Sequence, residues 1–116
     1  MKIEPAAFKD LNRAIRSRLA EELPPLSSTL VSSAVDFDIF TESYLLVVTM
    51  RDASGQLFEF HQRLHRIELE ESKQPLKSLA TWLNATVDGL LESVRAHNAR
   101  KKEQAKDAAL AALGET

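Results

Sequence analysis

The sequence contains no cysteine, and only three of its 116 residues are glycine. Without cysteine the chain can form no disulfide, no thiolate metal site and no thiol nucleophile. Gly55, Gly89 and Gly114 lie far apart, so the sequence has no glycine-rich loop of the kind that binds phosphates. No serine occurs in the Gly-x-Ser-x-Gly context of a hydrolase nucleophile. We therefore expect a protein that has no cofactor and is not an enzyme.

A long hydrophobic run is also missing. No window approaches the roughly 18 apolar residues that a membrane-spanning helix needs, and the first residues contain no apolar signal-peptide core. Together with the lack of cysteine, this pattern predicts a cytoplasmic protein that does not associate with a membrane. The length fits a single domain at residues 1–97, followed at 98–116 by a charged and then alanine-rich tail that is either helical or frayed.

The most hydrophobic stretch runs from Tyr44 to Met50 and has the sequence YLLVVTM. Apolar side chains follow one another there without period-two alternation, which predicts a strand covered on both faces. The next residues, Asp52 to Gly55, have aspartate first and glycine last, as in a tight hairpin turn. Residues 43–69 are therefore expected to form a hairpin and its continuation, around which the remaining chain packs.

A further strand is predicted on each side of this central one. The alternation over residues 30–40 predicts a half-buried first strand. The third strand is expected to start at Gln56, since Phe58 and Phe60 then share one face. Its end stays open, because residues 61–71 fit both a strand and a helical period; we expect a strand to about Leu64, followed by a bulge or short turn. The predicted core face of the first strand carries Val31, Val35, Phe37 and Ile39, interrupted by Ser33.

Two amphipathic helices are predicted, at residues 5–23 and 75–97. The first ends at Pro24-Pro25, because proline cannot continue the hydrogen-bond ladder of a helix. In the second, Trp82 flanks a wide apolar stripe, and Gly89 is expected to allow close backbone approach. The apolar positions are Phe8, Leu11, Ile15, Leu19 and Leu23 in the first helix, and Leu76, Leu79, Ala80, Leu83, Val87, Leu90, Leu91 and Val94 in the second.

These elements predict an α+β fold, a three-stranded antiparallel β-meander flanked by an N-terminal and a C-terminal helix in the order α-β-β-β-α. With both helices on one face, the central strand would expose either Leu45 and Val47 or Leu46 and Val48 on the other. Soluble monomers seldom leave such a strip uncovered, so we predict a homodimer formed through sheet faces or edges. The alternative is that residues 65–71 fold over this face. The predicted dimer or partner interface consists of Tyr44, Leu45, Leu46, Val47 and Val48.

Two histidines, His61 and His65, have the spacing of a helical metal-binding pair. On a strand, however, the same spacing separates them by about 13 Å, too far for one ion. No third ligand accompanies them, so we expect two solvated side chains and no metal site.

Carboxylates also occur on neighbouring strands. Asp36, Asp38 and Glu59 could form a group for acid–base or magnesium chemistry, but the central strand separates the first from the third. The expected role of the aspartates is cross-strand pairing with Arg51 or Arg63. No catalytic residue is therefore predicted.

Basic residues line one face of the first predicted helix and cluster around the end of the second, where they could follow a phosphate backbone. The element order is similar to that of the double-stranded-RNA-binding fold and of a family of dimeric bacterial nucleoid-associated proteins, although the sequence carries the motif of neither. The candidate contacts to nucleic acid or to an acidic partner are Lys9, Arg13, Arg16, Arg95, Arg100, Lys101, Lys102 and Lys106.

We interpret the sequence as that of a small non-enzymatic interaction protein that acts as a homodimer and binds another macromolecule. We expect this partner to be a protein. An adaptor, a chaperone-like factor or an inhibitor carried by a phage or mobile element would have these properties. The alternative is a nucleic-acid-binding protein that uses the basic faces of the two helices. The net charge of −2 at pH 7 disfavours a dedicated nucleic-acid coat.

Overall fold

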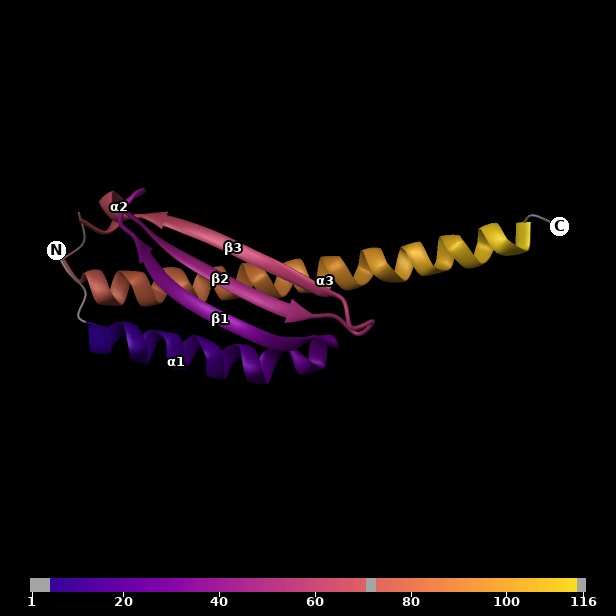
Figure 1. Ribbon diagram of the computed structural model, residues 1–116, viewed down its shortest axis with the longest axis horizontal. Helices are drawn as coiled ribbons and strands as arrows, with labels where there is room; N and C mark the ends of the chain where they lie inside the picture. Colours follow the sequence, from indigo (N-terminus) through magenta and orange to yellow (C-terminus); the bar gives the residue numbers. More distant parts are fainter. Residues whose placement is uncertain (1–4, 71–72, 115–116) are drawn as a thin grey trace.

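The structure is a computed structural model that describes residues 5–70 and 73–114. Its elements follow the predicted α-β-β-β-α order, with two short helices added (Figure 1). In chain order they are α1 (Pro5–Glu22), the 3₁₀-helix η1 (Pro24–Leu26), β1 (Thr29–Asp38), β2 (Ser43–Arg51), β3 (Leu57–His65), α2 (Arg66–Glu70) and α3 (Pro75–Gly114). No helix among the described residues is long and apolar enough to span a membrane.

The three strands form one antiparallel sheet in the order β1-β2-β3. Leu46 of β2 pairs with Val35 of β1 on one side and with Gln62 of β3 on the other. Tyr44, Leu46, Val48 and Met50 are buried, whereas Leu45 and Val47 are half-buried and point to the opposite face. Of the two alternatives that the sequence left open, the outward pair is therefore Leu45 and Val47.

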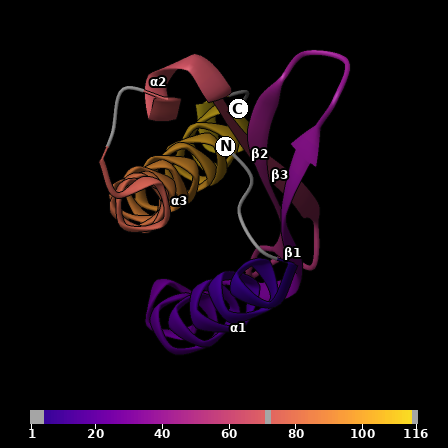
Figure 2. The ribbon, with the colours of Figure 1, turned by 90° about the vertical axis from the view of Figure 1, so that its left-hand side faces the viewer.

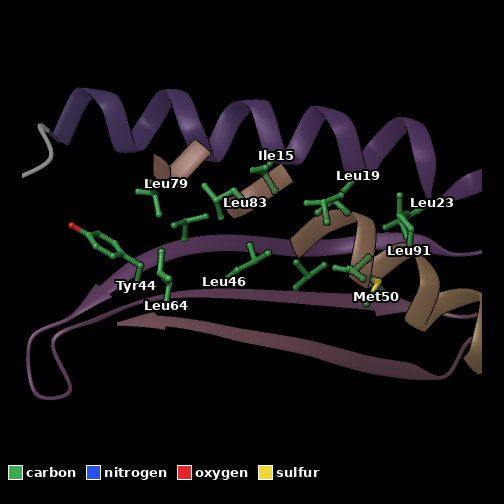
Figure 3. Close-up of a cluster of buried hydrophobic side chains, with 14 of the residues drawn as sticks. Ile15, Leu19, Leu23, Tyr44, Leu46, Met50, Leu64, Leu79, Leu83 and Leu91 are labelled. Carbon is green, nitrogen blue, oxygen red and sulfur yellow. The ribbon is translucent and has the colours of Figure 1, made fainter. Parts of the chain in front are cut away.

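Both long helices cover the same face of the sheet, α1 beside β1 and α3 beside α1 (Figures 1 and 2). Between the helices and the sheet lies one hydrophobic core, to which α1, α3 and the sheet all contribute (Figure 3). Ile15, Leu19 and Leu23 enter it from α1 and the residue that follows it, and Leu79 and Leu83 enter it from α3. The helical stripes predicted from the sequence are the surfaces that these helices bury, except for Leu76, which lies in the first turn of α3 and is 45% exposed.

Ion pairs join the two helices outside this core. Arg18 of α1 donates from Nη1 to the backbone oxygen of Asn84 at 3.0 Å and from Nη2 to Asp88. Its Nε also donates to Glu22, one turn further along α1, at 2.6 Å. These carboxylates, Asp88 first, raise the pKa of Arg18 above its ordinary value.

The first strand differs from its predicted alternation at both ends. A β-bulge between Leu30 and Ser32 adds one residue, so Val31 turns outward and is 50% exposed. Ile39 lies beyond the end of β1, in the turn to β2, and is 72% exposed. The prediction that these two side chains face the core is wrong, whereas Ser33 and Val35 are buried as expected.

The segment after the third strand is also more regular than expected. β3 continues to His65, and α2 follows directly in place of a bulge or short turn. Leu69 of α2 is only 3% exposed because it joins the core on the helix side of the sheet. Residues 65–70 therefore do not cover the outer face, and that alternative is wrong for the part of the segment that the structure describes; residue 71 lies outside the described residues.

The described part of the predicted tail continues the last helix, which is one of the two alternatives that the sequence left open. α3 continues without a break through the charged segment and the alanine-rich segment to Gly114, and it gives the molecule its length of 66 Å (Figure 1). Gly89 lies on its exposed side, and a Cβ added there would meet no atom within 4 Å. The expectation that Gly89 serves a close approach within this chain is therefore wrong.

The orientation of β2 can be tested with a neighbouring pair of leucines. We expect Leu46→Ala to lower the free energy of unfolding by about 2–5 kcal/mol, because it removes a fully buried side chain. Leu45→Ala, the matched control on the outer face, should cost clearly less. Urea unfolding measures both values. An equal or larger loss for Leu45→Ala would mean that β2 presents its other face to the helices.

Candidate interaction surfaces

The two edges of the sheet differ in how well they are protected. At β1, the Asn12 side chain of α1 satisfies both backbone groups of Val35: its oxygen accepts the Val35 N–H at 2.8 Å, and its Nδ2 donates to the Val35 oxygen at 3.3 Å. The bulge at Val31 further interrupts this edge. A bulge and a side chain bonded to the edge both disfavour the addition of another strand.

The edge at β3 is regular and open. All nine residues pair with β2 in an unbroken register, and none of them is a proline. At its end, the N–H of His65 donates to Glu68 at 3.1 Å. Within the described residues, no other hydrogen bond reaches the outer edge between Leu57 and Leu64, so alternate backbone groups there have no partner in the chain.

A groove runs along the inner side of this edge. Phe60 and Gln62 of β3 line the groove on one side, and residues of α3 line it on the other. Its volume is about 420 Å³. It arises because the helices bury the inner side chains of β2 but leave Phe58 and Phe60 half-buried and Gln62 exposed. From α3 the groove is lined by Trp82, Ala85, Thr86 and Gly89.

A second hollow of about 560 Å³ lies next to the groove, near the start of α3. Trp82 and Ala85 line both hollows, so together they form one continuous surface along α3. Trp82 is half-buried: it packs against the core and also lines the groove. We call this surface, with Phe60 and Gln62, the β3–α3 groove.

The outer face of the sheet is more polar than the sequence led us to expect. Leu45 and Val47 lie at its centre, between Asp36 on β1 and His61 and Arg63 on β3. The other three predicted interface residues, Tyr44, Leu46 and Val48, are buried in the core and cannot touch a partner. The apolar strip on this face is thus limited to two half-buried side chains.

One ion pair on this face joins the two outer strands across β2. Arg63 forms an ion pair with Asp38 at 3.5 Å, and it also donates to the Thr41 hydroxyl at 2.6 Å. The Phe40 N–H and the Thr41 hydroxyl lower the pKa of Asp38 through hydrogen bonds. Within residues 5–70 and 73–114, no group of three or more histidine and carboxylate side chains could hold a metal ion.

The basic residues predicted as nucleic-acid contacts form two separate groups. Lys9, Arg13 and Arg16 are exposed on α1, which begins at the end of the molecule opposite the free end of α3 (Figure 1). Arg95 is exposed on α3 and pairs with Glu92 at 2.5 Å. Lys101 is half-buried and donates to the Gln56 side chain. The remaining three, Arg100, Lys102 and Lys106, are exposed on the distal part of α3.

Asp52, the first residue of the β2–β3 turn, is a buried carboxylate that accepts several hydrogen bonds. Its Oδ1 accepts hydrogen bonds from the Ser54 hydroxyl at 2.6 Å, the Ser54 N–H at 3.0 Å and the Gln56 N–H at 2.9 Å. Its Oδ2 lies 2.9 Å from Nε2 of His97 on α3. The His97 ring in turn stacks on Phe58, with ring centroids 4.3 Å apart.

These contacts fasten the turn to α3. Asn98 adds a hydrogen bond of 2.6 Å to the Leu26 oxygen of η1. The Ser54 hydroxyl and His97 lower the pKa of Asp52 well below the ordinary value of an aspartate. The sequence identified the turn but not its attachment, because nothing local links Asp52 to a histidine 45 residues away.

Beyond Lys101, α3 leaves the body of the protein. All described residues from 102 to 114 are exposed, and we call this segment the α3 arm (Figure 1). Near its end, Leu110 and Leu113 are 57% and 72% exposed among alanines. A helix that exposes leucines in this way is accessible to a partner protein.

A second exposed apolar site lies at the β1–β2 turn. Ile39 and Phe40 project from this turn, and Phe40 is 93% exposed. The N–H of Arg66 donates to the Glu42 oxygen at 2.8 Å, which joins the turn to α2. Ile67 of α2 is exposed at the same end of the molecule.

No protein-family model, curated protein or solved structure matches the chain.

The attachment of the turn to α3 predicts a pH dependence of stability. Because the pKa of Asp52 is lower in the folded than in the unfolded chain, its charged form stabilises the fold above about pH 4, and this contribution is lost as the pH falls. We expect Asp52→Asn to lower the free energy of unfolding at pH 7 and to have less effect near pH 2. Denaturant unfolding across this range measures it, with Asp36→Asn as the control for loss of a charge. A destabilisation that is equal at all pH values would contradict the role of the charge.

Proposed function

We propose that the protein is a small cytoplasmic interaction protein without catalytic activity, which acts as a homodimer and binds another macromolecule. The observation that carries the proposal is the β3–α3 groove, where Phe60 and Trp82 remain partly uncovered beside an open strand edge. A two-fold dimer buries the same surface of both copies, so one open surface is sufficient to form it. The lack of cysteine agrees with a reducing compartment.

The dimer leaves other surfaces for a different partner. The α3 arm and the exposed turn at Phe40 both project from the body and do not line the groove. An exposed helix with leucines at its end can dock into the apolar groove of another protein. Two arms in one dimer would also raise the apparent affinity for a partner with two sites. An adaptor, a chaperone-like factor or an inhibitor carried by a phage or mobile element would bind in this way.

The solution mass tests the homodimer. We expect light scattering to give twice the mass of one chain, and Gly89→Arg to give the mass of one chain because the arginine fills the groove. The substitution should not harm the monomer, since space is open at Gly89 and arginine favours a helix by roughly 1 kcal/mol over glycine.

Ala14→Arg is the matched control, because it adds the same side chain to an exposed position of α1. This variant should remain dimeric. A wild-type mass of one chain at every concentration would refute the homodimer. A dimeric Gly89→Arg variant would exclude the groove as its interface.

Nucleic-acid binding is the second candidate function. It is supported by the exposed Arg13, Arg16, Arg100, Lys102 and Lys106, which have no ion-pair partner among the described residues. Basic side chains that are free of carboxylates can release counterions from a phosphate backbone. A homodimer would present two copies of each basic group, as a duplex-binding protein often does.

This candidate makes a separate prediction. Fluorescence anisotropy with a labelled DNA or RNA duplex should show an affinity that falls steeply as the salt concentration rises. Alanine at Arg13, Arg16, Lys102 and Lys106 should weaken the binding and reduce its salt dependence. Lys101→Ala is not part of this set, because its amine contacts Gln56 in the turn. Absent or salt-independent binding would eliminate this function.

A further inference from the structure

We propose that two copies of the chain join edge to edge, β3 against β3 in antiparallel orientation, so that their sheets form one six-stranded sheet. This inference rests on the homodimer proposed above and names the geometry of its interface. Hydrogen bonds between the two β3 strands would satisfy the backbone groups that are open in one chain. The two β3–α3 grooves would meet beneath the joint.

The choice of β3 follows from the contrast between the two edges. The β1 edge is occupied at Val35 by the Asn12 side chain and interrupted by the bulge at Val31. The β3 edge has neither feature, and its backbone groups between Leu57 and Leu64 have no partner outside the ladder with β2 within the described residues. Proteins normally cover or distort a strand edge that must remain unpaired, which is what this chain does at β1 only.

The charges on β3 select one register. Where the two-fold axis passes through His61, Glu59 of each copy lies opposite Arg63 of the other, and opposite charges at such positions attract. An axis at Glu59 places the Glu59 carboxylates of the two copies opposite each other, where like charges repel. An axis at Phe60 places Arg63 opposite Leu57, and an axis at Gln62 places it opposite His61. Only the His61 axis pairs both charged residues favourably.

The side chains of Glu59 and Arg63 are available for this pairing. Glu59 is exposed; its Oε1 lies 3.7 Å from Nε2 of His61 and accepts a hydrogen bond of 3.5 Å from the Thr49 hydroxyl. Arg63 is also exposed and uses only Nη1 for its contacts with Asp38, Thr41 and Ser43. These contacts lie towards β1, so in the dimer Arg63 would exchange them for a bond across the β3 edge to the carboxylate of the other copy.

The inner side of the joint is also complementary. With the axis at His61, Phe58 lies opposite Leu64 of the other copy, and Phe60 lies opposite Gln62. Both α3 helices then lie on the same side of the joined sheet, because directly opposed residues share a face. The small side chains of Ala85 and Gly89 leave room for the second α3 to approach the first.

Single cysteines test this register directly, because the natural chain has none. Directly opposed residues have Cα atoms about 4.5–5.5 Å apart, a separation that a disulfide spans. We expect His61→Cys to form a disulfide-linked dimer under mild oxidation. Glu59→Cys is the matched control: two such residues would lie about 13 Å apart and should not cross-link. A mixture of the Glu59→Cys and Arg63→Cys variants should cross-link as a pair of unlike chains.

A charge exchange gives a second, non-covalent readout. Glu59→Arg alone should raise the dissociation constant of the dimer, because it places like charges opposite each other. The double variant, with Glu59→Arg and Arg63→Glu, should return the dissociation constant of the dimer to the wild-type value.

These experiments test the homodimer and the register of its interface separately. A wild-type mass of one chain refutes the homodimer and this geometry together. A dimeric mass without a His61→Cys cross-link, or with equal cross-linking by Glu59→Cys, refutes the edge geometry alone. A failure of the double variant to restore the dissociation constant also refutes the proposed register.

Discussion

The fold depends on covering the inner face of a three-stranded sheet with two helices. α1 and α3 bury the inner side chains of β2, but they leave Phe60 half-buried and Gln62 exposed on β3. Burial of apolar surface is the dominant stabilising contribution in a small domain, about 25 cal/mol per Å². The partly uncovered Phe60 and Trp82 are therefore a source of stability that the chain alone does not use. A second copy at this site is the simplest way to use it, and it would also pair the open strand edge.

Much of the architecture could be predicted from the sequence, because periodicity and turn chemistry are local. The two helical stripes, the turn from Asp52 to Gly55 and the alternation of Phe58 and Phe60 are found where they were expected. The bulge at Val31 was not foreseen, because one extra residue in a strand leaves no local signal. The outward face of β2 could not be chosen either, since its side chains are apolar on both faces.

The surfaces that matter for interaction were harder to predict, because they depend on contacts between distant residues. Asn12 protects Val35 across 23 positions of the sequence, and Asp52 holds His97 across 45. The first contact decides which sheet edge is open, and the second sets the point where the α3 arm leaves the body. The β3–α3 groove likewise exists only once β3 and α3 are packed together. In the edge-paired dimer, two-fold symmetry would point the two arms in opposite directions, so each arm could reach a separate site on a partner.

Hydrogen exchange along β3 tests the central claim, that a second copy completes the sheet at this edge. At concentrations where the protein is dimeric, we expect the backbone amides of β3 to exchange slowly, both those that face β2 and those on the outer edge. On dilution to the monomer, only the outer-edge amides should become fast. The Val35 amide, which is bonded to Asn12 within the chain, should be slow at both concentrations and serves as the internal reference. Outer-edge amides of β3 that exchange at the solvent rate in a protein with the mass of a dimer would contradict the account.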